Sequence, residues 1–131
     1  MQRCPVCNAR LSAAPQCPRC SADLSRIVHS ERMAKQWLSV ALQTLQAGRA
    51  DIASHAVLRS LSFKQTPQAR LIKDFLIRHQ YQALYRTVER QYWQAARDAL
   101  ATLVLLQGQN EATRRFYELI EYASAADELN P

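Results

Sequence analysis

Four cysteines, all that the chain contains, fall in two pairs near its N-terminus. Residues 4–7 read Cys-Pro-Val-Cys and residues 17–20 read Cys-Pro-Arg-Cys. Each Cys-x-x-Cys segment can bend so that both sulfurs reach one ion, and proline at its second position fixes φ and stiffens that bend. Two such pairs supply the four thiolates of a tetrahedral structural zinc site. The spacing therefore predicts one structural Zn²⁺, held by Cys4, Cys7, Cys17 and Cys20.

The residue after each pair commonly has a positive φ, which favours glycine. Here these residues are Asn8 and Ser21. Asparagine tolerates the left-handed region fairly well, whereas serine does so less readily.

Other chemistry for these cysteines is less well matched. A redox Cys-x-x-Cys motif begins a helix in a βαβ unit, and neither pair has that context. An iron site of the rubredoxin type stays open, although the short spacer and the absence of clustered aromatic residues disfavour it. A catalytic zinc is disfavoured because four thiolates leave no position for water or substrate.

The arrangement resembles the short zinc ribbons of bacterial and archaeal proteins. The matching positions are Cys4, Pro5, Cys7, Leu11, Cys17, Pro18, Cys20 and Leu24. Asn8 and Ser21 depart from the glycines that are usual in that pattern. The resemblance covers residues 3–24 and implies a fold but no activity.

The charge and the cysteine usage limit the class of protein. The formal net charge is +6, which falls to about +4 when four thiolates bind one Zn²⁺. This mildly basic balance does not by itself indicate a nucleic-acid binder. No signal segment or membrane-spanning apolar run is visible. We expect a soluble, cytoplasmic protein without a membrane partner, in a compartment where thiols stay reduced.

The rest of the chain favours helices, because it is rich in alanine, leucine, glutamine and arginine and has only two glycines in all. Hydrophobic spacing and helix breakers predict helices over 25–47, 50–63, 67–90 and 92–107, and a fifth after Asn110. Thr66 and Pro67 form a helix start signal. The predicted fold is mostly α, with a zinc ribbon over 1–24 and a helical domain over 25–131.

Apolar residues at three- and four-residue steps predict the buried faces of the first, second, third and fifth helices. These are Ile27, Met33, Trp37, Val40, Ala41 and Leu45 in the first helix, Ile52, Ala53, Ala56, Val57 and Leu61 in the second, Leu71, Phe75, Leu76, Ala83, Leu84 and Val88 in the third, and Ala112, Phe116, Leu119, Ile120 and Ala123 in the fifth.

The first two helices resemble a tetratricopeptide repeat in the spacing of Trp37, Val40, Ala41, Gly48, Ala53 and Val57. A second unit aligns 43 residues later, with Ala96 matching Ala53, Leu100 matching Val57 and Val88 matching Leu45. Gln91 replaces Gly48 there, and Gln80 replaces Trp37. The resemblance implies two antiparallel hairpins and a capping fifth helix. A single compact helical bundle is the structural alternative.

No catalytic constellation is found, so we expect a protein that is not an enzyme. His29, His55 and His79 are far apart in the sequence and on different helices, and two glycines cannot make a phosphate-binding loop. The densest basic group, a candidate partner-binding surface, comprises Arg59, Lys64, Arg70, Lys73 and Arg78. Basic side chains on a helical array can clamp carboxylates of a partner.

These features together predict a non-catalytic zinc-binding adaptor that recognises another protein through its helices and its ribbon. The alternative is a nucleic-acid-binding accessory protein that uses the ribbon and a basic helical face. Against it, the ribbon carries only three arginines, Arg3, Arg10 and Arg19. The apolar run over 103–106 predicts either a central fourth helix or a homo-oligomer contact through that helix.

Overall fold

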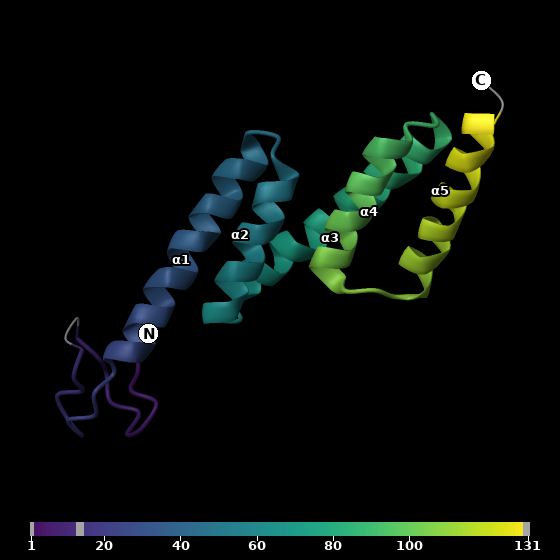
Figure 1. The fold of residues 1–131 in the computed structure, drawn as a ribbon. Coiled ribbons are helices and arrows are strands. Elements are labelled where there is room, and N and C mark those ends of the chain that lie inside the picture. The colour runs from purple at the N-terminus through teal and green to yellow at the C-terminus, as the bar shows by residue number, and fades with distance from the viewer. Residues whose placement is uncertain (1, 13–14, 130–131) are drawn as a thin grey trace.

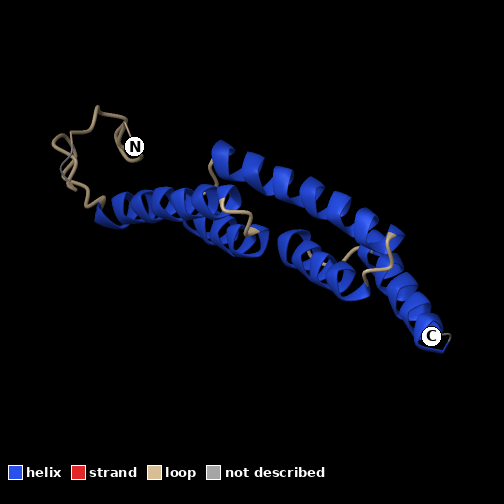
Figure 2. Cartoon of the chain, turned by 90° about the horizontal axis from the view of Figure 1, so that it is seen from above, coloured by secondary structure: helices blue, strands red, loops and turns tan. Residues whose placement is uncertain are grey.

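A computed structural model describes residues 2–12 and 15–129. Residues 1 and 13–14 of the predicted ribbon, and 130–131 of the predicted helical domain, lie outside the described residues. The described chain holds five helices: α1 (Ser25–Gln46), α2 (Ala50–Phe63), α3 (Pro67–Glu89), α4 (Trp93–Gln107) and α5 (Glu111–Leu129). Figure 2 shows no strand in the described part of the chain. The predicted mostly-α fold with five helices is confirmed.

Local signals fix where two of these helices, α3 and α5, begin. The Thr66 side chain accepts a hydrogen bond from the Ala69 backbone N–H at 3.2 Å, and Pro67 follows it at the first helical position. The Asn110 side chain accepts from the Thr113 N–H at 2.9 Å, and the Thr113 hydroxyl accepts from the Asn110 N–H at 2.9 Å. These bonds satisfy N–H groups that have no partner inside the helix.

The helices form an extended array (Figure 1). The contacts join α1 to α2 and α3 to α4 as antiparallel hairpins, with further contacts of α3 on α2, α5 on α4 and α2 on α4. The cysteine segment lies at one end of the array and α5 at the other. In the described part of the chain no helix has the length and apolarity that crossing a membrane requires.

Two core clusters hold the array together, and α3 contributes to both. The first core cluster comprises Ala41, Ala53, Ala56, Val57, Leu61, Ala69, Leu76 and Leu106. The second core cluster comprises Leu84, Ala96, Ala99, Leu100, Leu103 and Ile120. Ala53 and Ala96, each fully buried, let their hairpin partners approach closely. Leu103 and Leu106 lie in different clusters, which places α4 centrally in the array.

The two hairpins correspond residue by residue at a spacing of 43. At the end of α1, Gly48 and Arg49 donate to the carbonyls of Leu45 and Thr44. At the end of α3, Gln91 and Tyr92 donate to the carbonyls of Val88 and Thr87 in the same pattern. This pair of hydrogen bonds closes the C-terminal end of each helix around a residue with a left-handed backbone conformation. Gly48 has φ 77° and Gln91 has φ 60°, so the turn is the same although the residue differs.

The predicted buried faces need correction at several positions. Leu71 is 66% exposed and Phe75 is 48% exposed, because α3 packs against its neighbours through Ala69 and Leu76, which are buried. Further exposed residues among those predicted to be buried are Ile27, Val40, Ile52, Ala112 and Leu119. In α1 and α2 small side chains take the inner positions, such as Ala34 and Ser54. Hydrophobicity alone does not choose between two apolar stripes on one helix, whereas contact with the neighbouring helix does.

Candidate metal centre

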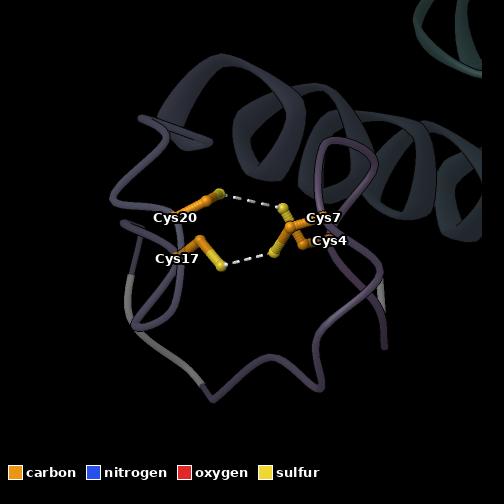
Figure 3. A group of neighbouring side chains, drawn as sticks. All are labelled: Cys4, Cys7, Cys17 and Cys20. Atoms are coloured by element: carbon orange, nitrogen blue, oxygen red, sulfur yellow. Dashed lines mark hydrogen bonds between the residues drawn. The ribbon is translucent and has the colours of Figure 1, made fainter.

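The four cysteine sulfurs converge on one point (Figure 3). Their Sγ atoms all lie within 4.8 Å of one another. The Cys4 and Cys20 sulfurs are 3.7 Å apart, and those of Cys7 and Cys17 are 3.6 Å apart. A tetrahedral ion with metal–sulfur bonds of about 2.3 Å separates its ligands by about 3.8 Å. A disulfide would require about 2.05 Å, so the donor set fits a metal ion.

Two equivalent knuckles, one around each cysteine pair, position the sulfurs. In the first, the Cys4 N–H donates to the Ala9 carbonyl and the Asn8 N–H to the Cys4 carbonyl, each at 2.9 Å. In the second, the Cys17 N–H donates to Ala22 at 3.0 Å and the Ser21 N–H to Cys17 at 2.9 Å. Isolated antiparallel bridges flank them, Arg3 with Arg10 and Gln16 with Asp23. Each knuckle therefore presents two sulfurs from a closed backbone loop.

The residues after the two pairs have the positive φ that is common at this place in Cys-x-x-Cys knuckles. Asn8 has φ 60° and Ser21 has φ 59°. The left-handed backbone turns each chain back after its second cysteine. A side chain then braces each turn, because Arg3 donates to the Asn8 carbonyl at 3.1 Å and Gln16 donates to the Ser21 carbonyl at 3.2 Å.

The electrostatics of the cluster favour a cation. A backbone N–H of Cys20 that donates to the Cys17 sulfur is the main cause that lowers the pKa of Cys17 to about 6. For Cys20, a backbone hydrogen bond at Ala22 acts to lower the pKa, but desolvation and the three neighbouring sulfurs raise it to about 12. Clustered thiols cannot all ionise together without a positive charge between them. A divalent ion supplies that charge.

We expect Ser21→Gly to tighten metal binding, because Ser21 has a left-handed backbone. A serine in that region costs about 1 kcal/mol relative to glycine, once the larger unfolded-state entropy of glycine is counted. This corresponds to about a fivefold gain in affinity, measured by competition with a coloured chelator. Asn8→Gly is the matched comparison and should gain less, because asparagine tolerates the left-handed region better. Equal affinity of Ser21→Gly and the parent chain would contradict the strain at Ser21.

A small apolar cluster connects the cysteine cluster to the helices. It comprises the buried residues Cys4, Cys17 and Leu24, with Val28 of α1 packed against it. The Val28 N–H also donates to the Leu24 carbonyl at 2.9 Å, and the Asp23 side chain accepts from the Ser25 N–H at 3.0 Å. Asp23 and Leu24, which follow the second cysteine pair, therefore cap the start of α1.

The predicted basic surface has mixed surroundings. Lys64 pairs with Glu31 of α1 at 2.9 Å, and the Arg59 guanidinium lies 5.2 Å from the centre of the Phe63 ring. Arg70 donates to the Gln65 side chain at 3.3 Å. Lys73 and Arg78 are five residues apart on α3, which turns them about 140° from each other. The structure brings the cysteines together but gives these five residues no shared partner, so their binding role stays a prediction.

Helix α3 carries an exposed stripe that includes two residues predicted to be buried, Leu71 and Phe75. It runs over Leu71, Phe75, Arg78, Gln82 and Tyr85, at steps of four and three, and we call it the α3 stripe. Its apolar members Leu71, Phe75 and Tyr85 are 66%, 48% and 59% exposed. Phe75 stacks on His79 with ring centres 6.0 Å apart. The rings of Tyr85 and Phe116 pack in an edge-to-face arrangement with ring centres 5.3 Å apart. Apolar side chains held at the surface in this way are typical of contact surfaces.

Comparison with known proteins gives no relative: no protein-family model, no curated protein and no solved structure matches the chain.

Proposed function

We propose that this protein is a non-catalytic cytoplasmic adaptor, in which a zinc ribbon is joined to a tetratricopeptide-like helical array that binds another protein. The sulfur geometry supports a structural role for the metal, since four thiolates complete a tetrahedral shell. Zinc is the ion that we favour over iron. A colourless protein that carries one zinc per chain is the expected outcome of metal analysis, and a coloured iron protein would overturn that assignment.

The helical part supports the adaptor role through the 43-residue correspondence of its two hairpins. Repeated hairpins with small residues between their helices are typical of arrays that present a long surface to a partner. Their helical faces bind peptides by apolar anchors at regular spacing. Free thiols in place of disulfides agree with a reducing compartment.

The observation that carries the proposal is the α3 stripe. Leu71 and Phe75 expose apolar surface although fully buried positions on the same helix are apolar too. Arg78 lies next to them on that face. A partner segment with apolar side chains and a carboxylate would match this chemistry, with Leu71 and Phe75 as anchors and Arg78 as the charged contact.

The test uses the full zinc-loaded chain as bait in lysate of the native host, beside a Phe75→Glu variant. We expect a specific protein to be retained by the parent chain and to drop about tenfold with the variant. Tyr122→Glu on α5 is the matched control and should retain it. Circular dichroism of both variants checks that the helices are unchanged.

Retention of RNA or DNA in place of protein, with affinity that falls steeply as salt rises, would overturn the adaptor in favour of the nucleic-acid alternative. Equal retention of the protein by the parent chain and by Phe75→Glu would remove the α3 stripe from the binding surface.

A further inference from the structure

Helix α5 has a second apolar face that no described part of the chain covers. Its first face packs on α4 through the buried residues Thr113, Ile120 and Ser124. The second face lies on roughly the opposite side of the helix. It comprises Ala112, Arg115, Leu119, Tyr122, Ala126 and Leu129, and we call it the α5 stripe. Leu119, Tyr122 and Leu129 are 46%, 80% and 82% exposed.

The internal repeat shows that this face is suited to burial. On α3, the positions 43 residues before Ala112 and Leu119 are Ala69 and Leu76, and both are fully buried in the first core cluster. On α5 the same positions line an open depression of about 350 Å³, together with Arg115 and Phe116. Ala112 and Leu119 therefore match buried residues of α3, but the described chain provides no element that covers them.

The stripe has the spacing of a two-helix contact. Ala112, Leu119 and Ala126 are seven residues apart, and so are Arg115, Tyr122 and Leu129. This is the a and d pattern of a coiled-coil seam, which stays on one side of a helix over two heptads. The seam is about 26 Å long. Figure 1 places α5 at the free end of the array, away from the cysteine segment.

We propose that the α5 stripe pairs antiparallel with the α5 stripe of a second copy of this chain. A two-fold interface must be complementary to itself. With the two-fold axis crossing the stripe midway between Leu119 and Tyr122, Ala112 faces Leu129 of the other copy, Arg115 faces Ala126, and Leu119 faces Tyr122. Where two facing side chains differ in size, a large side chain therefore lies against an alanine.

Charge also favours the antiparallel direction. Arg114 and Arg115 share the N-terminal half of α5 with Glu111 and Glu118, so that half has no net charge, whereas Glu121, Asp127 and Glu128 make the C-terminal half acidic. Antiparallel pairing brings the acidic half of each helix beside the neutral half of the other, which carries Arg114 and Arg115. Parallel pairing would set Arg115 against Arg115 and acid against acid, which is unfavourable. The dimer does not depend on the adaptor function or on the α3 stripe.

The test is sedimentation equilibrium of the full zinc-loaded chain from about 10 to about 500 µM, because one helix pair gives an interface at the low end of the stable range. The expected mass rises from 14.9 kDa toward twice that value. Tyr122→Glu should weaken the dimer about tenfold or more. Leu71→Glu, on the α3 stripe, is the matched control and should leave it unchanged.

A second variant tests the direction of pairing. Ala126→Glu places a carboxylate opposite Arg115 of the other copy and should strengthen the antiparallel dimer about two- to fivefold. In a parallel pair the same change sets Glu against Glu and weakens association. A mass of 14.9 kDa at every concentration, a dimer unaffected by Tyr122→Glu, or weakening by Ala126→Glu would each overturn the proposal.

Discussion

Cys17→Ser is expected to abolish tight metal binding and to unfold the segment before α1, while most of the helical signal remains. Cys17 supplies one of four ligands and is itself buried in the small cluster with Cys4 and Leu24. So few buried side chains cannot fold a segment of this length without a metal. Structural zinc binding contributes about 10 kcal/mol or more in such modules, so its loss decides whether the segment is folded.

Two measurements separate the ribbon from the helices in this variant. Bound metal per chain should fall from one to none, and limited proteolysis should cut before residue 25. Far-ultraviolet circular dichroism should lose only the first turn of α1, which Leu24 and Asp23 now stabilise. Val6→Ala, at a side chain that is 70% exposed on the first knuckle, is the control and should keep its metal. Complete loss of the helical signal in Cys17→Ser would mean that the ribbon belongs to the helical core.

Leu84→Ala is expected to destabilise the helical array by about 3 kcal/mol, within the usual range for a buried leucine. Leu84 is fully buried in the second core cluster. Removing a buried leucine side chain loses its transfer free energy and leaves a cavity, at a cost of about 2–5 kcal/mol. Urea unfolding followed by circular dichroism measures the change.

The matched control for this substitution is Leu71→Ala, at a side chain that is largely exposed on α3. An exposed leucine loses little on truncation, so the free energy of unfolding should change by less than about 0.5 kcal/mol. Equal destabilisation by Leu71→Ala and Leu84→Ala would contradict the burial of Leu84 against the second core cluster.

The shape of that unfolding curve tests how the two core clusters are coupled. Helix α3 runs without interruption from Leu76 in the first cluster to Leu84 in the second. We therefore expect Leu84→Ala and Leu76→Ala to shift one common transition. An early partial transition in Leu84→Ala, with the first hairpin still folded, would show that the clusters unfold separately.

The helix boundaries were predictable because local residues determine them. Thr66, Asn110 and Gly48 act on the turn in which they lie, and each helix begins within a residue or two of its prediction. The cysteine cluster was predictable for the same reason, since the spacing of the cysteines alone brings the members of each pair together. Both depend on contacts between residues close in sequence.

The buried faces were predicted less well, because they depend on distant partners. Leu71 and Phe75 are as apolar as Leu76, but only Leu76 meets α2 and α4 across the first core cluster. Lys64 was predicted to belong to a basic partner-binding surface, but its ammonium group pairs with Glu31, which lies 33 positions earlier in the chain. The left-handed turn at Gln91 was hidden as well, because glutamine gives no signal for it, unlike Gly48.

The 43-residue spacing has a consequence for how the array can grow. Helix α5 begins two such spacings after α1, at the position where a third unit starts. Each unit contacts mainly its immediate neighbours, so an added unit would need no change in the others. Duplicating residues 68–110 between α4 and α5 would lengthen the molecule by one hairpin and leave both the metal centre and the terminal helix as they are. The architecture is thus modular, with two specialised ends and an interchangeable middle.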